Sequence, residues 1–585
     1  MTESLEQRNV LALECKHLCK QFTTGKRVVN ALHDVSLNVA KGAVVGLVGP
    51  DGAGKTTLLR LAAGLLLADS GMISVFGYDC NQQVTDVHRL IGYMPQRFGL
   101  YEDLSVAENL DLYANLHGVS QTERQQRFDE LMQMTGLEPF TQRLAGRLSG
   151  GMKQKLGLAC TLLSHPALLL LDEPSVGVDP VSRRELWNII DHQVKNNGMT
   201  VILSTAYLDE AERCSDVVLL DEGNKLDQNS PENFNKAMQG HSYQISHSEL
   251  SNRPLQTLLS SQPGIVDAVI QGDKVRIISD NTELPDLPLF KQDHEKLSIE
   301  RVAPRLEDAF VARLKKQHPA EAMLAAKVSV NSKTSITEEA VIQVEGVDRW
   351  FGDFQAVKKL SFTVKRGEIF GLLGANGAGK TTTFRMLCGL LPPSNGQLRV
   401  VGVDLRKAAA KARARIGYMS QKFSLYANLS VNENLAFFSS AYGLRNTQRK
   451  QRIQWAIQQF DLESNLDSDS GDLPLGYKQR LAMACALMHE PEILFLDEPT
   501  SGVDPLARRE FWNRTNQLAA SGVTVLVTTH FMEEAEYCDR LVIMREGDIL
   551  TAGTPADIKK QVISEACPNP TMEDAFIQLV EAKQS

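Results

Sequence analysis

The sequence predicts an α/β fold in which two similar domains, each with a helical subdomain, follow one another, with a small α/β accessory domain after the first. Three observations support this prediction: segments that recur at one fixed spacing, apolar runs that lead into glycine-rich loops, and apolar runs that end in paired carboxylates. The chain has 585 residues, which is too long for a single hydrophobic core and enough for about two to four domains.

The composition is that of a folded globular protein, with 43% hydrophobic and 23% charged residues. No apolar run reaches the roughly 18–20 residues that cross a bilayer, and the first residues lack the features of a secretory signal. The nine cysteines form no C-x-x-C pair, which favours a reduced cytoplasmic compartment. A net charge of −9 gives no general attraction to nucleic acid, so we expect no nucleic-acid partner.

The chain is a tandem repeat of one domain. Three segments recur at an offset of 325 residues: GPDGAGKTT (49–57) as GANGAGKTT, IGYMPQRFGLYEDLSVAENL (91–110) as IGYMSQKFSLYANLSVNENL, and LLLLDEPSVGVDP (168–180) as ILFLDEPTSGVDP. Because the intervals match in both halves, the pattern indicates duplication of a whole domain rather than chance recurrence of short motifs.

The first half contains an insertion. The stretch from Gly223 to Glu307 spans 84 residues, whereas the matching stretch from Gly547 to Glu573 spans 26. Within the insertion, IVDAVI and KVRIIS flank residues 271–273 and alternate at the strand period, which predicts a hairpin. A polar stretch rich in Ser, Thr, Lys and Ala follows and is typical of a flexible linker. The expected boundaries are 1–239 for the first domain, 240–318 for the accessory domain with its terminal helix, 319–339 for the linker and 340–585 for the second domain.

In each half an apolar run leads into a glycine loop that ends in Gly-Lys-Thr-Thr. This matches the phosphate-binding pattern G-x-x-x-x-G-K-[ST] between a strand and a helix, and predicts two P-loop NTPase domains. The glycines let backbone N–H groups converge on phosphates, and the helix N-terminus adds positive potential. Lys55 and Lys380 would reach the β- and γ-phosphates, while Thr56 and Thr381 would ligate Mg²⁺. The expected nucleotide-binding residues are Gly49, Pro50, Asp51, Gly52, Ala53, Gly54, Lys55, Thr56 and Thr57, and in the second half Gly374, Ala375, Asn376, Gly377, Ala378, Gly379, Lys380, Thr381 and Thr382.

A pair of carboxylates follows a second apolar run in each half. Four apolar residues place Asp172 and Asp497 at the end of a buried strand, where each could hold the magnesium shell. The next residues, Glu173 and Glu498, could act as the base that polarises the attacking water.

Together these motifs resemble the ATP-binding cassettes of the ABC family, and the resemblance covers nearly the whole chain outside the insertion and linker. LSGGMKQ at 148–154 is similar to the family's signature segment, which implies that Ser149, Gly150 and Gly151 cap the γ-phosphate bound by the opposite lobe. The resemblance implies ATP and Mg²⁺ as ligands. It also assigns the glutamine-loop residues Gln96 and Gln421, which sense magnesium, the D-loop residues Asp179 and Asp504, the switch histidine His530, and the adenine-stacking rings Phe22 and Phe351.

Two segments depart from the family pattern. In the first half the switch histidine is missing, because Ala206 stands where the second half has His530. In the second half the signature reads LPLGYKQ, with Pro474 and Leu475 in place of serine and glycine, and only Gly476 is retained. Proline has no N–H to offer to a phosphate.

The lobes of ABC proteins pair head to tail, which implies here that the two lobes pair within one chain and share two ATP sites. Site one would join Lys55 and Glu173 with the altered signature, and site two would join Lys380, Glu498 and His530 with the intact one. Both defects then fall in site one. We predict that site one binds ATP but hydrolyses it slowly, whereas site two is the working site.

The appended domain, the LEDAF-like ends and the GYMPQRFGLYEDLSVAENL stretch resemble the drug-resistance type of ABC exporter ATPase, of a drug, multidrug or cation efflux class. This implies two separate multi-spanning permease subunits, membrane contact only through them, and a peripheral place on the cytoplasmic face of the inner membrane. Two alternatives stay open: a ribosome-associated translation factor of the ABC family and the fused ATPase of a sugar importer.

By analogy with that family, permeases would dock near Gln96–Tyr101 and Gln421–Tyr426. Ordinary packing of the helical subdomain is the alternative role for the aromatic residues of these stretches, which are Phe98, Tyr101, Phe423 and Tyr426.

Overall fold

The computed structural model describes residues 11–24, 27–96, 99–283, 287, 296–317, 339–421, 423–565 and 567–582. Phe98 and nearly all of the expected linker lie outside the described residues. The chain divides into two compact units: one is Met1–Met238 with Pro304–Phe310, and the other is Gln239–Ala303 with Val311–Ser585.

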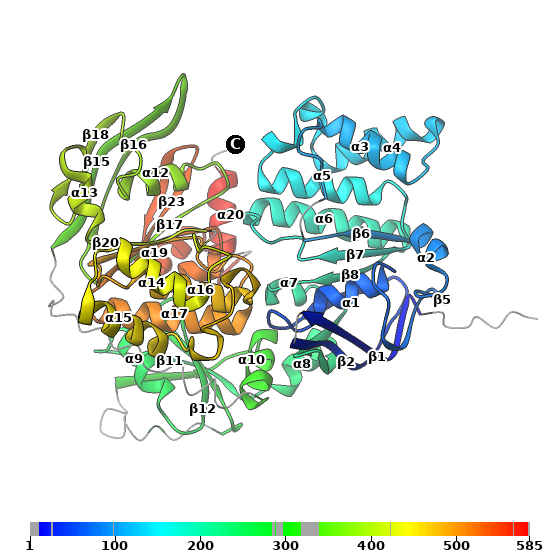
Figure 1. The fold of residues 1–585 in the computed structure, drawn as a ribbon, viewed down its shortest axis with the longest axis horizontal. Coiled ribbons are helices and arrows are strands. Elements are labelled where there is room, and N and C mark those ends of the chain that lie inside the picture. Colours follow the sequence, from blue (N-terminus) through cyan, green and yellow to red (C-terminus); the bar gives the residue numbers. More distant parts are fainter. Residues whose placement is uncertain are drawn as a thin grey trace, which may run out of the picture. The chain divides into compact units, whose positions relative to one another are not determined.

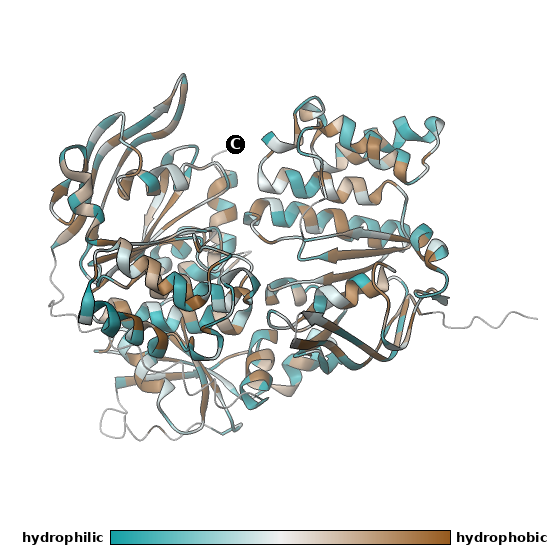
Figure 2. Cartoon of the chain, in the orientation of Figure 1, coloured by the Kyte–Doolittle hydropathy of each residue, from teal (hydrophilic) through white to brown (hydrophobic). Residues whose placement is uncertain are grey.

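A sheet of six strands forms the centre of the first unit (Figure 1). Its strands are β3 (Val44–Val48), β6 (Ile91–Met94), β7 (Leu168–Asp172), β8 (Thr200–Ser204), β9 (Asp216–Asp221) and β10 (Asn224–Asn229). Their order is β10-β9-β3-β8-β7-β6, and every neighbouring pair is parallel except β9 with β10. β7 and β8 are buried along their whole length, as expected for parallel strands covered on both faces, and they form part of the brown centre in Figure 2.

An antiparallel sheet lies beside this centre and shares its core. Its strands are β1 (Leu13–Thr24), β2 (Arg27–Val39), β4 (Ser70–Val75) and β5 (Tyr78–Asp79), in the order β2-β1-β4-β5. Leu18, Leu32 and Ile73 from this sheet are buried in one cluster with Leu170 of β7. The helices around the two sheets are α1 (Lys55–Ala62), α2 (Val84–Leu90), α6 (Pro180–Asn197), α7 (Leu208–Ala211) and α8 (Pro231–Ala237).

The helical subdomain that the sequence predicts for each half is present in the first unit, between β6 and β7. It consists of α3 (Val106–Leu116), α4 (Gln121–Thr135), α5 (Gly150–Leu162) and two short 3-10 turns. α3 begins with a capping box, in which Ser105 Oγ accepts from Glu108 N (3.2 Å) and Ser105 N donates to Glu108 Oε2 (2.7 Å). The second repeat has the same arrangement at Ser430 and Glu433.

The second unit repeats this architecture. Its six-stranded sheet has the order β20-β21-β22-β17-β23-β24, with β17 (Ile369–Gly374), β20 (Ile416–Met419), β21 (Ile493–Asp497), β22 (Thr524–Thr529), β23 (Arg540–Arg545) and β24 (Asp548–Gly553). The antiparallel sheet contains β15 (Ala340–Phe351), β16 (Phe354–Lys365), β18 (Asn395–Val400) and β19 (Val403–Asp404). The helices are α12 (Lys380–Leu387), α13 (Leu405–Arg413), α14 (Val431–Ala441), α15 (Asn446–Gln459), α16 (Leu475–Ala486), α17 (Pro505–Ala520), α18 (Met532–Ala535), α19 (Pro555–Lys560) and α20 (Met572–Ala582).

The insertion forms an antiparallel sheet within the second unit. It contains β11 (Ser242–His247), α9 (Asn252–Ser260), β12 (Ile265–Gln271), β13 (Lys274–Ser279) and β14 (Leu297–Arg301), with the strand order β12-β13-β11-β14. The predicted hairpin around residues 271–273 is confirmed, because β12 and β13 pair across that turn. Tyr243, Ile245, Leu255 and Ile277 are buried in a cluster of the sheet's own. The domain boundaries drawn from the sequence stay predictions.

The two repeats differ in how tightly their helical subdomains pack. In the first unit an open cavity of about 560 Å³ lies between α4, α5 and α6, with Thr135 and Ile189 among the residues that line it. At the matching positions the second repeat has Phe460 and Arg514, and the cavity there is only about 10 Å³. The larger side chains therefore fill a space that stays open in the first repeat.

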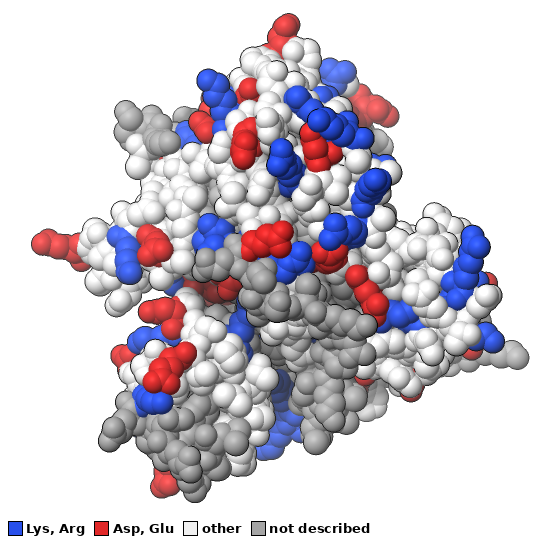
Figure 3. All heavy atoms as spheres, turned by 90° about the vertical axis from the view of Figure 1, so that its left-hand side faces the viewer, with Lys and Arg blue, Asp and Glu red and all other residues white. Residues whose placement is uncertain are grey.

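Positive and negative side chains are interspersed over the face drawn in Figure 3. Among the helices that the structure describes, none has both the length and the apolar character required to span a bilayer.

Candidate functional site

Each glycine loop connects a central strand to a helix, as the sequence predicts. The first loop lies between β3 and α1, and the second between β17 and α12. The last glycine of each loop has a left-handed backbone, with φ of 99° at Gly54 and 97° at Gly379. A Cβ atom would lie 2.4 Å from Ala31 O at the first position and 2.7 Å from Ala356 O at the second. Only glycine fits there, because both the backbone angle and the available space exclude a side chain.

The lysine of each loop is buried at the start of its helix. Lys55 Nζ donates to Gly49 O (2.7 Å) and to Pro50 O (3.0 Å). Lys380 Nζ donates to Gly374 O at 2.6 Å. Both amino groups therefore lie against the backbone of the glycine loop. An ammonium group and converging backbone N–H donors at this position can together bind the phosphates of a nucleotide.

The first carboxylate of each pair ends a central strand beside a hydroxyl group. In the first unit Thr56 Oγ1 donates to Asp172 Oδ1 (3.0 Å), so the structure brings these two predicted metal ligands together. Asp172 Oδ2 is buried and accepts no hydrogen bond from the described residues, which leaves a lone pair available next to Thr56. This set fits Mg²⁺, which binds proteins through one or two carboxylates and completes its shell with phosphate and water oxygens. In the second unit Asp497 lies at the end of β21, whereas Thr381 is exposed in the first turn of α12.

The second carboxylate of each pair has an unusual backbone and a glutamine partner. Glu173 and Glu498 have φ of 50° and 46°, in the left-handed region that residues with a Cβ rarely adopt. Gln96 Nε2 donates to Glu173 Oε2 (2.5 Å), and Gln421 Nε2 donates to Glu498 Oε2 (2.6 Å). The predicted base and the predicted glutamine-loop residue therefore meet in both repeats.

The two glutamates differ in their electrostatic environment. His530 Nδ1 lies 3.3 Å from Glu498 Oε1, without the alignment of a hydrogen bond, while Ala206 occupies the matching place near Glu173. Burial raises the pKa of Glu173 above its usual value. Burial acts in the same direction on Glu498, but the interaction with His530 is part of an opposing effect that lowers the pKa of Glu498.

A hydroxyl group that the sequence motifs do not indicate links each carboxylate pair to the neighbouring strand. Ser204 Oγ donates to Asp172 Oδ1 (2.8 Å) and accepts from Glu173 N (2.9 Å). Thr528 Oγ1 donates to Asp497 Oδ1 (2.5 Å) and accepts from Glu498 N (3.1 Å). The available signal was a pair of adjacent hydroxyl residues at the end of the apolar run in both repeats, Ser204-Thr205 and Thr528-Thr529.

The signature segments start helices of the two subdomains. Ser149 is the N-cap of α5, and its side chain accepts from Met152 N (3.3 Å). Gly150 is the first residue of α5, as Leu475 is of α16. Pro474 stands at the N-cap of α16 and makes no side-chain cap bond. The second signature has therefore lost both a capping hydroxyl and a backbone donor.

The glycine that both signatures retain lies at a close approach between helices. A Cβ on Gly151 would lie 2.6 Å from Ser182 Oγ of α6, and one on Gly476 would lie 3.1 Å from Ala507 Cβ of α17. This packing accounts for Gly476 independently of any contact with a nucleotide.

The aromatic rings expected to stack on adenine are exposed. Phe22 of β1 is 37% exposed and Phe351 of β15 is 47% exposed, so neither belongs to a hydrophobic core. The guanidinium of Arg349 lies 4.6 Å from the centre of the Phe351 ring.

The aromatic residues of the glutamine loops divide between surface and interior. Tyr101 and Tyr426 are 54% and 48% exposed, whereas Phe423 is buried. Tyr426 contacts Phe437, which is also exposed, with ring centres 4.5 Å apart. The second helical subdomain therefore presents a pair of aromatic rings at its surface.

Comparison with known proteins gives consistent matches. A family model described as ABC transporter matches residues 32–176 and 357–501. The chain is 51% identical over 550 residues to the probable multidrug ABC transporter ATP-binding protein YbhF of Escherichia coli (strain K12), covering 94% of this chain and 95% of that protein. It is 41% identical over 250 residues to the Nod factor export ATP-binding protein I of Paraburkholderia xenovorans (strain LB400), covering 42% of this chain and 82% of the relative. The linearmycin resistance ATP-binding protein LnrL of Bacillus subtilis (strain 168) is 39% identical over 219 residues, or 37% of this chain and 70% of the relative.

Proposed function

Because this chain belongs to the ABC transporter family of ATP-binding proteins, we propose that it powers a drug-resistance type exporter and hydrolyses ATP mainly at one of two sites. The observation that supports the exporter role is the 51% identity to a probable multidrug ATP-binding protein over 94% of the chain. The observation that supports unequal sites is the imidazole of His530 beside Glu498, with Ala206 at the matching position of the first repeat.

At the working site the second repeat supplies the hydrolytic groups. Glu498 accepts the proton of the attacking water as the new bond to the γ-phosphorus forms and the bond to the β-phosphate oxygen breaks. Gln421 and His530 hold the two carboxylate oxygens of Glu498, and Lys380 neutralises phosphate charge. Bound Mg²⁺ would supply further charge neutralisation, held by Thr381, Gln421 and Asp497 there and by the corresponding residues Thr56, Gln96 and Asp172 of the first repeat.

We infer that the lobes pair within one chain, so that Ser149, Gly150 and Gly151 complete the working site. The other site combines Lys55 and Glu173 with a signature in which Pro474 replaces the serine. It lacks both the switch imidazole and two of the signature donors, and it therefore holds ATP with slow turnover.

Two single substitutions test this assignment on the full chain. Glu498→Gln should lower kcat for ATP hydrolysis by about 10²–10³-fold, because it removes the base while preserving side-chain shape. Glu173→Gln is the matched control and should retain at least about half of the kcat. Steady-state phosphate release measures both. A larger loss for Glu173→Gln than for Glu498→Gln would contradict the assignment.

The transported compound would be bound by two separate multi-spanning permeases, with this chain at the cytoplasmic face of the membrane. The exposed rings of Tyr426 and Phe437 support a docking surface on the helical subdomain, since aromatic side chains are enriched in interfaces. Affinity purification of the tagged chain in mild detergent, followed by mass spectrometry, tests this. Two multi-spanning membrane proteins are the expected partners, whereas ribosomal proteins without permeases would refute the exporter role.

A further inference from the structure

We propose that the inserted α/β domain positions the catalytic groups of the second ATP site. Helix α9 of that domain contacts the amino ends of the strands whose carboxyl ends lead into the site. The inference rests on the proposed function in one respect, namely that the second repeat provides the working base. It goes beyond that function because it assigns a catalytic purpose to a domain that lies outside the cassettes.

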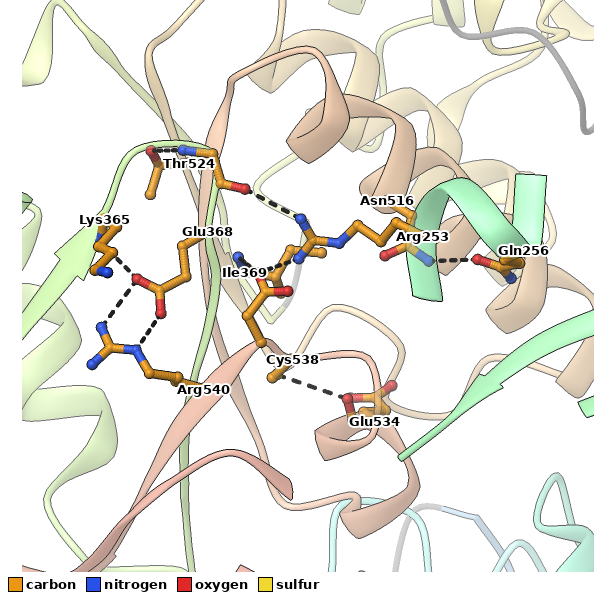
Figure 4. A network of polar contacts seen from close by, with 12 residues as sticks. Arg253, Gln256, Lys365, Glu368, Ile369, Asn516, Thr524, Glu534, Cys538 and Arg540 are labelled. Atoms are coloured by element: carbon orange, nitrogen blue, oxygen red, sulfur yellow. Dashed lines mark hydrogen bonds and ion pairs between the residues drawn. The ribbon is translucent and has the colours of Figure 1, made fainter. Parts of the chain in front are cut away.

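Arg253 of α9 contacts the turn that precedes β17 in the central sheet of the second cassette. One guanidinium nitrogen donates to Gly367 O (3.2 Å), and the other forms an ion pair with Asp539 Oδ2. The same Asp539 oxygen accepts from Ile369 N at 2.8 Å. Figure 4 shows the arginine entering this position from α9. One carboxylate therefore connects the inserted domain to the first residue of β17.

The strands that begin here end at the ATP site. β17 runs from Ile369 to Gly374, the first glycine of the phosphate loop. Gly367 N donates to Thr524 Oγ1 (3.0 Å), and Thr524 is the first residue of β22. β22 ends immediately before His530. Strands of six residues span about 20 Å, so Arg253 lies one strand length from both catalytic segments and is joined to each by a continuous strand.

A second group of contacts holds the helix that follows the D-loop. Gln256 Nε2 donates to Asn513 Oδ1 (3.0 Å), and Asn516 Nδ2 donates to Gln256 Oε1 (3.0 Å). Both asparagines belong to α17, whose N-cap is the D-loop residue Asp504. Both the nitrogen and the oxygen of the Gln256 amide are thus bonded to the same helix. Figure 4 shows the contact with Asn516.

A buried ion pair strengthens this second contact. Asp267 of β12 pairs with Arg509 of α17, and both residues are buried. Lys315 Nζ also donates to Asp267 Oδ1 (2.6 Å). Removing one partner of a buried pair leaves the other charge without compensation, so this arrangement holds β12 and α17 in one register.

The first repeat has the same arrangement at the amino end of its central strand β3, but without the acidic acceptor. Ser215 stands where the second repeat has Asp539, and its hydroxyl accepts from Val44 N (3.2 Å) and donates to Val44 O (2.9 Å). The link between the adjacent glycine and threonine is retained, as Gly42 N donates to Thr200 Oγ1 at 2.9 Å. The acidic side chain that receives Arg253 is therefore specific to the second repeat.

These contacts define what a loss of Arg253 would change. The backbone of the phosphate loop and Lys380 should still bind ATP, because Lys380 Nζ donates to Gly374 O within the loop itself (2.6 Å). The near ends of β17 and β22 would be held less firmly. His530 follows the far end of β22, and Thr528 of the same strand accepts from Glu498 N, so the switch histidine and the base would both be placed less accurately for the transition state. Small displacements of catalytic groups lower kcat more than they weaken ground-state binding.

The test uses the full chain with Glu173→Gln, so that the second repeat supplies the hydrolysis. Arg253→Ala should lower kcat about fivefold and leave the KM for ATP within about twofold. Arg253→Lys should restore part of the loss, because it retains the charge opposite Asp539. Lys274→Ala is the matched control: Lys274 pairs with Glu300 inside the inserted sheet (2.9 Å), and its removal should leave kcat unchanged.

The kcat values of Glu498→Gln and Glu173→Gln are first compared in chains that keep Arg253. If the second repeat does not supply the working base, this comparison shows it before Arg253 is changed. A kcat of Arg253→Ala within about twofold of its parent would overturn the inference, whatever happens to KM. An equal loss of kcat in Lys274→Ala would also overturn it, because a general weakening of the inserted domain would then explain both variants.

Discussion

His530 is the side chain that most sharply distinguishes the two repeats, and its replacement by alanine copies the first repeat. The imidazole is 1% exposed, and its Nδ1 lies 3.3 Å from Glu498 Oε1. Loss of one preorganised group at a centre of developing charge costs about 3–4 kcal/mol, or about 10²–10³-fold in rate. We expect His530→Ala to lower kcat by about 10²-fold and to leave the KM for ATP within about twofold, since Lys380 and the glycine loop are untouched.

The assay is the initial rate of phosphate release from the full chain at saturating ATP and pH 7.5. His489→Ser is a suitable control, because it removes another largely buried imidazole from the same unit, one that bonds to Ile416 O outside the site. Its kcat should match that of the parent. If His530→Ala retained more than about a third of the parent's kcat, the imidazole would not be part of the hydrolytic machinery and the reasoning would fail.

Two further predictions concern stability. Burial lowers the pKa of His489 to about 4, below the 6.5 of an exposed histidine, so its contribution is present above pH 6.5 and is lost as the pH falls toward 4. Serine is the residue of the first repeat at this position, Ser164, so His489→Ser is the comparison variant. Between pH 7.5 and pH 5, the free energy of unfolding of the parent should fall by about 2 kcal/mol more than that of His489→Ser, as measured in urea titrations. Arg514→Ile copies the first repeat and strands the carboxylates of Asp461 and Glu510, which pair with the guanidinium at 2.7 and 2.6 Å. It should destabilise the second unit by about 3 kcal/mol in the same titrations, and an unchanged midpoint would contradict this role.

The parts of the fold that the sequence predicts are those set by local patterns. The strand–loop–helix around Lys55 and the buried strand ending at Asp172 are each continuous in sequence, and the repeat doubles the information for both. The hairpin of the inserted domain was predictable for the same reason, because alternation and a turn are local signals.

The parts that the sequence did not predict depend on contacts between distant segments. Arg253 and Asp539 lie 286 residues apart, and nothing near either residue indicates the other. The insertion follows the first cassette in sequence, yet it belongs to the second unit, because residues such as Gln256 find their partners there. The hydroxyl of Ser204 was missed because a serine at a strand end has many possible roles until the neighbouring strand is placed beside it.

The docking of α9 on the second cassette constrains how such a chain can exchange parts with its relatives. A hybrid that takes its first half from one protein and its second from another would join an inserted domain to a cassette that never adapted to it. Arg253 would then face whatever residue the foreign cassette has in place of Asp539, and Gln256 would face an unrelated stretch of helix. The natural unit of exchange is therefore the segment from residue 239 to the C-terminus, and a crossover point placed before the insertion keeps these partners together.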